Sequence, residues 1–228
     1  MTIGEDIMNL ASFIDHTLLR PDATEHEIRR LCREGVAHRF ATICVMPWWI
    51  TTAVNECDRL ESSIPLCAAV GFPLGMHRTE IKRHEAERAV RDGAGEIDMV
   101  IAVGALKGGD HLSVQDDIRS VADIVHASGC LLKVIIETCL LSKMEKGRAC
   151  ELAVEGGADY VKTSTGFSAA GATVDDVKLM RSIVGDTIGV KASGGIRDRA
   201  TAEAMIAAGA SRIGTSSGPT ILRAFEHD

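Results

Sequence analysis

The sequence predicts an α/β fold, a closed (β/α)8 barrel with an extra helix at its N-terminus. Eight short apolar runs alternate with amphipathic stretches. Such alternation favours a parallel sheet, because parallel neighbours need a helical crossover. Several amphipathic stretches end in glycine just before the next apolar run, as in "RDGAGEIDMV" and "AAGASRIGTS", so one strand-plus-helix unit repeats along the chain. An open doubly wound sheet is the alternative, but its GxGxxG signature is absent.

The elements follow in order along the chain. We expect "GEDIMNLA" at residues 4–11 to form the extra helix and to close the bottom of the barrel. The predicted strands are short, apolar and β-rich, and they cover residues 12–19, 40–45, 66–72, 96–103, 131–138, 159–165, 188–194 and 212–217. The predicted helices between them carry apolar residues at three- and four-residue spacing, and they include residues 23–37, 77–94, 114–129, 143–158, 173–185 and 197–210.

A single domain over residues 1–228 is expected, because no linker divides the chain and its five prolines do not cluster. The chain is 46% hydrophobic and 25% charged, with a mean hydropathy of +0.10, which is typical of a globular protein. No run approaches the roughly 18 consecutive apolar residues of a membrane helix, and the N-terminus does not resemble a secretory signal.

The charge and the cysteines narrow the possible partners. A net charge of −7 argues against a nucleic-acid partner, although backbone N–H groups at a helix N-terminus can still bind a phosphate. Seven scattered cysteines without a CxxC pair suggest neither a disulfide framework nor a structural zinc site. We therefore expect a protein of the reducing cytoplasm.

Two lysines in predicted strands are the strongest functional signal. Lys162 lies in "VKTSTG" and Lys191 in "VKASGG", on strands that the barrel makes neighbours. Two ammonium groups close together disfavour each other's charged form, and burial acts in the same direction. One of them can then be a neutral amine that forms a Schiff base with a carbonyl substrate, and Asp98 in the fourth strand is a suitable proton shuttle. The expected chemistry is metal-free carbon–carbon bond making and breaking; the alternative is that each lysine pairs structurally with a carboxylate.

Glycine and hydroxyl residues follow the last two strands. Gly194 and Gly195 end strand seven, and Ser216 and Ser217 end strand eight before Gly218. Loops in these positions form the usual phosphate site of a (β/α)8 barrel, where glycine lets the backbone approach the anion. Ordinary βα turns are the alternative reading.

These motifs together resemble the 2-deoxyribose-5-phosphate aldolase family. The resemblance rests on "IDHTLL", "VGFPLG", "EIDMVIAVG", "LLKVIIET", "DYVKTSTGF", "VKASGGIR" and "GTSSG", which occur in the family's order over essentially the whole chain. It implies a TIM barrel and a class I aldolase that reversibly cleaves 2-deoxy-D-ribose 5-phosphate to D-glyceraldehyde 3-phosphate and acetaldehyde. It also implies a homo-oligomer, with no cofactor and no metal.

The resemblance assigns roles residue by residue. Lys162 would be the Schiff-base lysine, Lys191 would favour its neutral form, and Asp98 would shuttle protons with a bound water. The expected substrate-binding residues are Asp15, Thr17, Cys44, Lys133 and Thr165. The expected phosphate-binding residues are Gly166, Gly194, Gly195, Arg197, Ser216 and Ser217. Some members carry a lysine after "KTSTG" where this chain has Phe167, which predicts weaker phosphate affinity or greater tolerance of non-phosphorylated aldehydes.

Several readings stay open. Lys133 either joins the proton network or forms a structural pair. His16 is expected to point away from Asp15, on the opposite face of its strand, and "PWWITTAV" is read as a packing cluster or a subunit contact. The alternative functions are a different Schiff-base aldolase and a non-catalytic sugar-phosphate sensor, although a sensor has no need of a neutral amine.

Overall fold

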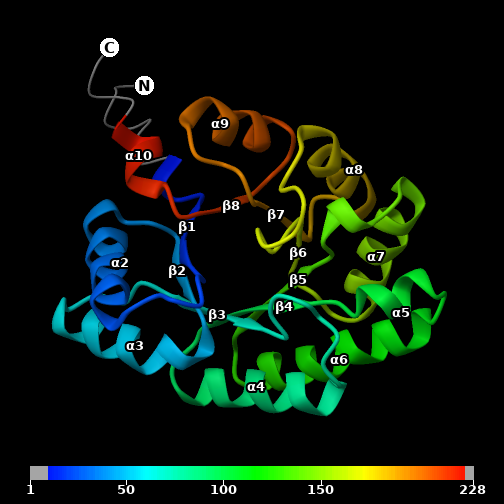
Figure 1. The fold of residues 1–228 in the computed structure, drawn as a ribbon, viewed down its shortest axis with the longest axis horizontal. Coiled ribbons are helices and arrows are strands. Elements are labelled where there is room, and N and C mark those ends of the chain that lie inside the picture. The colour runs from blue at the N-terminus through cyan, green and yellow to red at the C-terminus, as the bar shows by residue number, and fades with distance from the viewer. Residues whose placement is uncertain (1–9, 224–228) are drawn as a thin grey trace.

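The computed structural model describes residues 10–223, which form a closed barrel of eight parallel strands in chain order, and this confirms the predicted (β/α)8 fold. The strands are β1 (Ile14–Leu18), β2 (Thr42–Val45), β3 (Leu66–Val70), β4 (Glu96–Val100), β5 (Leu131–Ile135), β6 (Tyr160–Lys162), β7 (Gly189–Ser193) and β8 (Arg212–Thr215). Figure 1 looks along the barrel, with the helices arranged in a ring around the strands.

The α-helices of the described residues are α2 (Glu25–His38), α3 (Ile50–Arg59), α4 (Thr79–Arg91), α5 (Val103–Lys107), α6 (His111–Ala127), α7 (Lys143–Glu155), α8 (Val174–Val184), α9 (Arg199–Ala207) and α10 (Gly218–Arg223). Short 3-10 helices, η1 (Pro47–Trp49) and η2 (Thr138–Leu140), follow β2 and β5. Side-chain caps explain where two of the long helices begin. Thr24 with Glu27 starts α2 and Ser142 with Glu145 starts α7, each as a capping box that satisfies otherwise unpaired backbone N–H groups.

Strands β5 and β6 end earlier than the sequence predicts. The predicted strand 131–138 stops at Ile135, because Glu137 takes a left-handed conformation (φ 54°) that turns the chain into η2. The predicted strand 159–165 stops at Lys162, and residues 163–165 leave the barrel as a loop. Lys162 is therefore the last residue of its strand, at the carboxyl-terminal mouth of the barrel.

The strand register brings the polar interior residues together. Lys162 pairs with Lys191, Asp98 with Lys133 and Cys44 with Cys67 as neighbours across adjacent strands. The main hydrophobic core lies between the strands and the helices, and a smaller apolar cluster surrounds Cys44 and Cys67.

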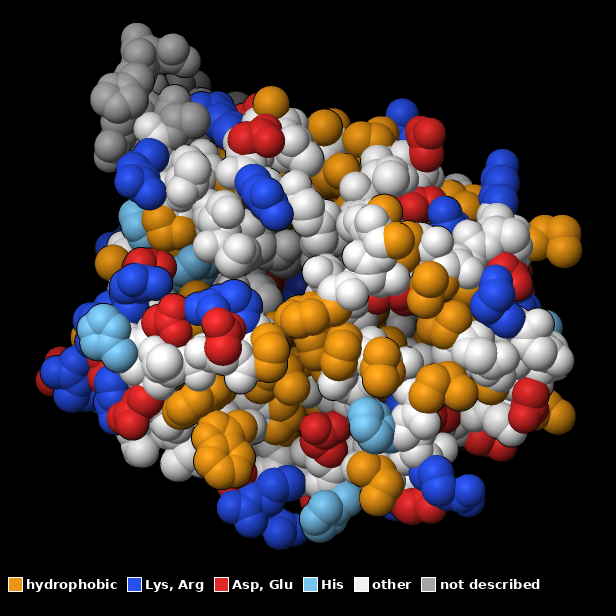
Figure 2. Space-filling view, in the orientation of Figure 1, with side chains coloured by type: hydrophobic (Ala, Val, Ile, Leu, Met, Phe, Trp, Pro, Cys, Tyr) orange, Lys and Arg blue, Asp and Glu red, His pale blue; other side chains and the backbone are white. Residues whose placement is uncertain are grey.

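Residues 4–9 of the predicted N-terminal helix lie outside the described residues. Its last two positions, Leu10 and Ala11, belong to the main core. In "PWWITTAV", Trp49 packs against that core while Trp48 is 84% exposed, so the packing interpretation holds for one tryptophan, and a subunit contact stays a prediction. Hydrophobic side chains gather on the face shown in Figure 2, over β3. Within residues 10–223, no helix has both the length and the apolar character needed to cross a membrane.

Candidate active site

Asp98 is the centre of a buried ion-paired network inside the barrel. Its Oδ2 accepts hydrogen bonds from the Nζ atoms of Lys162 at 2.7 Å and Lys191 at 2.8 Å. Its Oδ1 accepts from Lys133 Nζ at 2.9 Å and from the Cys67 thiol at 3.1 Å. The structure thus brings together Lys162, Lys191 and Asp98, the three residues that the sequence predicts to be catalytic.

Two further carboxylates hold the lower part of the network. Asp15 lies 2.5 Å from Lys191 Nζ and 2.7 Å from Arg212, and Glu96 lies 2.5 Å from Lys133 Nζ. Four cations therefore face three carboxylates: Lys133, Lys162, Lys191 and Arg212 against Asp15, Glu96 and Asp98. If all were ionised, the interior would carry one uncompensated positive charge.

The ion pairs of the network shift the pKa values of its buried groups. Burial alone would raise the pKa of Asp98, but the ammonium groups of Lys133, Lys162 and Lys191 outweigh it and hold that pKa well below its ordinary value. Burial alone would lower the pKa of Lys191, yet Asp15 and Asp98 raise it above its ordinary value. Burial likewise acts against the charged form of Lys133, whose pKa is nevertheless raised, chiefly by Asp98. Lys191 and Lys133 are thus held as ammonium ions.

A cavity of about 440 Å³ opens at the carboxyl-terminal mouth of the barrel. Lys162 lines this cavity, whereas Lys133 and Lys191 do not. The sequence-predicted residues that join Lys162 in its wall are Thr17, Thr165, Gly166, Gly194, Gly195, Arg197 and Ser216. The candidate nucleophile and most of the candidate phosphate-binding residues therefore face one common space.

The glycine loops are built for close backbone approach. Gly166, Gly194 and Gly195 all have positive φ angles, of 84°, 87° and 80°, a conformation that favours glycine. A Cβ at Gly194 would lie 2.9 Å from the Cα of Gly171, so no larger residue fits there without moving the loop. These positions leave backbone N–H groups free of side-chain bulk, as an anion site requires.

Six predicted site residues do not line the cavity. Four of them belong to the ion-paired network: Asp15, Asp98, Lys133 and Lys191. Cys44 is fully buried beside Cys67, and the backbone N–H of Ser217 donates to Thr215 Oγ1 at 2.9 Å. Lys133 forms a structural ion pair with Glu96 and also contacts Asp98, the candidate proton shuttle. The structural-pair and proton-network interpretations therefore each describe part of its environment.

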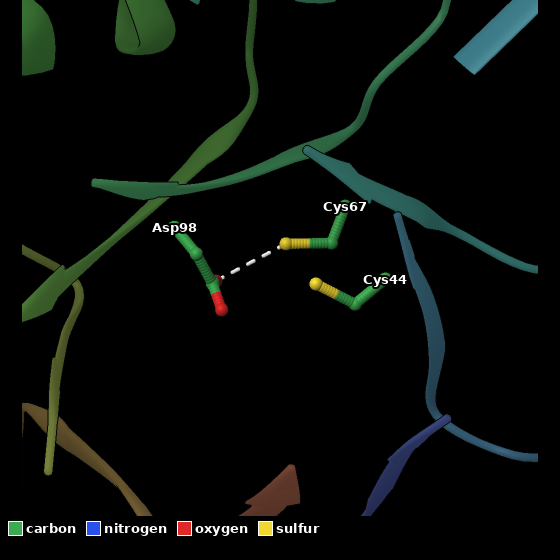
Figure 3. A group of neighbouring side chains, drawn as sticks. All are labelled: Cys44, Cys67 and Asp98. Atoms are coloured by element: carbon green, nitrogen blue, oxygen red, sulfur yellow. Dashed lines mark hydrogen bonds between the residues drawn. The ribbon is translucent and has the colours of Figure 1, made fainter. Parts of the chain in front are cut away.

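Cys44, Cys67 and Asp98 form a compact group (Figure 3), with one potential ligand atom from each within 4.8 Å of the others. Two thiols and a carboxylate are a plausible donor set for a metal ion. Here, however, Lys133 Nζ already lies 2.9 Å from Asp98 Oδ1 and 3.4 Å from Cys67 Sγ. A metal cation would be repelled by that ammonium group at close range.

Sequence reasoning missed two residues around the site and the backbone turn at a third. Arg212 and Glu96 are the first residues of β8 and β4, and a charged residue at a strand start normally reads as solvent-exposed. Glu137 lies in the quoted motif "LLKVIIET", but its left-handed backbone cannot be read from an apolar run. One signal in the sequence could have revealed Glu96: it starts an apolar strand, and the next strand along the chain carries Lys133.

His16 and Phe167 also have defined surroundings. His16 points away from Asp15, as predicted, and its Nε2 lies 2.9 Å from Glu34 on α2. Phe167 lines the cavity, remains 49% exposed, and packs edge-on against Phe72 with ring centroids 5.3 Å apart.

Comparison with known proteins identifies the family. Residues 10–225 match the DeoC/LacD family aldolase profile. The chain is 55% identical over 214 residues to a deoxyribose-phosphate aldolase of a Geobacillus species, covering 94% of this chain and 95% of the relative. It is 51% identical to the deoxyribose-phosphate aldolase of Thermococcus gammatolerans, covering 94% and 96%.

Solved structures agree. A tetrameric deoxyribose phosphate aldolase from Aeropyrum pernix superposes with a TM-score of 0.90 at 33% identity, covering 99% of this chain and 96% of that one. An aldolase designated QR15 superposes with a TM-score of 0.89 at 38% identity, covering 96% of both chains. The chain belongs to the DeoC/LacD aldolase family.

Proposed function

We propose that this member of the family is a carbon–carbon lyase that reversibly cleaves 2-deoxy-D-ribose 5-phosphate to D-glyceraldehyde 3-phosphate and acetaldehyde, in the breakdown of deoxyribose phosphates. The observation that carries the proposal is the placement of Lys162. It faces the cavity beside Asp98, while Lys191 and Lys133 beneath it keep their charges. The relatives, which match nearly the whole chain, are named deoxyribose-phosphate aldolases, so a deoxyribose phosphate is the expected substrate.

Lys162 Nζ attacks C1 of the open-chain aldehyde, and loss of water gives an iminium ion. The electron pair of the C2–C3 bond moves into this iminium as the hydroxyl on C3 loses its proton, and glyceraldehyde 3-phosphate leaves. The remaining enamine takes a proton on C2, and hydrolysis of the new iminium releases acetaldehyde and regenerates Lys162. The iminium is the electron sink, so the proposed reaction uses no metal and no cofactor.

Asp98 is the proposed proton shuttle. Its Oδ2 lies 2.7 Å from Lys162 Nζ, within reach of every proton that this nitrogen gains or loses. Because the lysines hold the pKa of Asp98 well below its ordinary value, a proton that it accepts passes on quickly to water or substrate. Asp98 is therefore suited to pass protons on, and not to hold one as a stable carboxylic acid.

The remaining residues have supporting roles in the proposal. Gly166, Gly194 and Gly195 would offer backbone N–H groups to the phosphate, and the side chains of Arg197 and Ser216 in the cavity wall would complete that site. Ser217, which follows Ser216 in the same loop, stays a candidate phosphate ligand although it does not line the cavity. Thr17 and Thr165 would contact the sugar chain directly. Asp15, Cys44 and Lys133 would act through the network below Lys162, and not by touching substrate.

We further propose one aldolase domain over residues 1–228, a cytoplasmic location and a homo-oligomer. All seven cysteines are unpaired, as expected in a reducing compartment. The Aeropyrum relative is a tetramer, and this chain exposes Trp48, Leu74 and Met76 at 84%, 72% and 59%. Light scattering combined with size-exclusion chromatography tests the oligomer.

Borohydride trapping tests the imine. The enzyme is incubated with acetaldehyde, reduced with borohydride and digested, and an ethyl adduct is expected on the peptide that contains "VKTSTG". The Lys162→Ala variant should give no adduct and no turnover, whereas Lys146→Ala, on the outer helix α7, should give both. An unmodified "VKTSTG" peptide in the wild-type enzyme would remove the Schiff-base mechanism.

A further inference from the structure

Five hydroxyl side chains of the described residues line the cavity. Four of them donate their proton to an acceptor of the protein: Thr17 to Asp15 O at 2.8 Å, Ser193 to Ser164 O at 2.6 Å, Thr215 to Ile196 O at 2.7 Å, and Thr165 to Glu137 Oε2. Carbonyl oxygens can only accept, so in the first three pairs the hydroxyl must be the donor, and Thr165 Oγ1 likewise donates to Glu137 Oε2. This part of the wall therefore offers lone pairs to a ligand, and not protons.

Such a wall suits some parts of a sugar phosphate better than others. A phosphate group is an acceptor and needs donors, which the glycine loops and Arg197 can supply. The hydroxyl groups of a sugar chain can donate, and they match the lone pairs of the four wall hydroxyls. The two kinds of ligand group thus have separate partners around one cavity.

Thr165 is the wall hydroxyl whose direction is set by a side chain. Its proton goes to Glu137 Oε2, and its Oγ1 accepts the backbone N–H of Phe167 at 3.1 Å. A hydroxyl oxygen has two lone pairs, so one remains free. Thr165 lies three residues beyond Lys162 and lines the cavity with it, so that free lone pair belongs to the site.

Glu137 is held in place for this contact. Its carboxylate is almost fully buried, and both of its oxygens lie 3.3 Å from the backbone nitrogen of Thr165. Its left-handed backbone (φ 54°, ψ 67°) turns the end of β5 toward the exit of β6. A non-glycine residue in this region is uncommon and often marks a functional site.

We propose that Glu137 is a positioning residue that fixes the Thr165 hydroxyl as a hydrogen-bond acceptor for a hydroxyl group of the sugar chain. Glu137 itself touches no substrate. The inference rests on the aldolase function proposed above. It adds that recognition of the hydroxylated chain is separable from imine formation at Lys162.

Two reactions of the same enzyme distinguish these steps. Exchange of the acetaldehyde methyl protons in D2O requires the imine and enamine at Lys162 but involves no sugar hydroxyl. Cleavage of 2-deoxy-D-ribose 5-phosphate requires both. The exchange rate is measured together with kcat and KM for cleavage. The proteins compared are the wild type, Glu137→Met, Thr165→Val, Thr165→Ser and the Glu137→Met/Thr165→Val double variant. Glu56→Gln serves as the control. Glu56 is a buried carboxylate on α3 that pairs with Arg29, Arg33 and Arg59 outside the barrel.

In Glu137→Met and in Thr165→Val, kcat/KM for cleavage is expected to fall at least roughly tenfold more than the exchange rate, because one hydrogen bond to the substrate is lost. The double variant should be no worse than Thr165→Val, since Glu137 acts through Thr165. Thr165→Ser should recover cleavage, and Glu56→Gln should keep both rates.

Equal loss of exchange and cleavage in folded variants, or no loss of cleavage, would overturn the inference. Additive losses in the double variant would do so as well, because Glu137 would then act independently of Thr165. A wild-type enzyme that exchanges no methyl protons would instead refute the proposed function itself. Circular dichroism identifies variants that fail to fold; Glu137→Gln, which keeps one acceptor oxygen, then replaces Glu137→Met and should show a smaller loss with the same selectivity for cleavage.

Discussion

Replacement of Lys191 by leucine tests the electrostatic core of the mechanism. The Nζ atoms of Lys162 and Lys191 lie 2.7 and 2.8 Å from the same oxygen of Asp98. Sharing one oxygen keeps the two nitrogens within about 5.5 Å of each other, where two unit charges repel by about 3 kcal/mol or more at an effective dielectric constant of about 20. Without Lys191 the interior holds three cations against three carboxylates, and Lys162 can keep its proton. The population of neutral amine should then fall about a hundredfold.

The assay is kcat/KM for cleavage of 2-deoxy-D-ribose 5-phosphate from pH 6 to pH 10. At neutral pH, Lys191→Leu should lose about two orders of magnitude of activity. Because the loss is one of protonation, activity should recover about tenfold for each pH unit on the alkaline side. Lys82→Met is the matched control. Lys82 is fully buried and pairs with Asp117 at 2.6 Å between α4 and α6, so its loss should lower stability and leave the shape of the pH profile unchanged.

If Lys191→Leu were as active as the wild-type enzyme at neutral pH, the reasoning would be refuted. A large loss that does not recover at high pH would also refute it, since Lys191 would then act by geometry and not by charge.

Four further outcomes are expected. Asp98→Asn should remove most turnover and lower the free energy of unfolding by about 3–5 kcal/mol, as measured by denaturant titration, because it leaves buried ammonium groups unpaired. Gly194→Ala should raise KM for deoxyribose 5-phosphate more than KM for deoxyribose, because its Cβ would lie 2.9 Å from Gly171 Cα in the phosphate loop. Phe167→Lys should do the opposite and lower KM for the phosphorylated sugar, since it adds a cation to the cavity wall; equal changes for both sugars would contradict this. Burial lowers the pKa of His16 from 6.5 in spite of its hydrogen bond to Glu34, so only the unfolded chain binds this proton near that pH. Stability should therefore fall as pH drops below about 6.5, and His16→Gln should flatten that dependence in thermal melts.

The barrel could be predicted because its evidence is local. Strand alternation, amphipathic spacing and glycine after helices each depend on a few neighbouring residues, and all eight strands appear where the sequence places them. The strand ends were less predictable. β5 ends early where Glu137 turns left-handed, and the Glu137 carboxylate contacts Thr165, 28 residues along the chain.

The site was predictable to the extent that it lies on strand ends. Lys162, Lys191 and Asp98 could be chosen as candidates because a charge in an apolar strand is costly unless it is paired or used. Asp15 was predicted to approach substrate, but the structure shows it bound to Lys191 and Arg212. Depth inside a barrel depends on strand tilt and register, which one sequence does not reveal.

The ion-pair partners also support Lys162, and not its neighbours, as the proposed nucleophile. Lys162 lines the cavity, whereas Lys133 and Lys191 do not. Those two lysines have carboxylates of their own, Glu96 for Lys133 and Asp15 for Lys191, while Lys162 shares Asp98 with both. In the proposed mechanism the one positive charge in excess is therefore relieved at Lys162, whose side chain faces the cavity. The same imbalance that would destabilise a closed core would then make this nitrogen reactive.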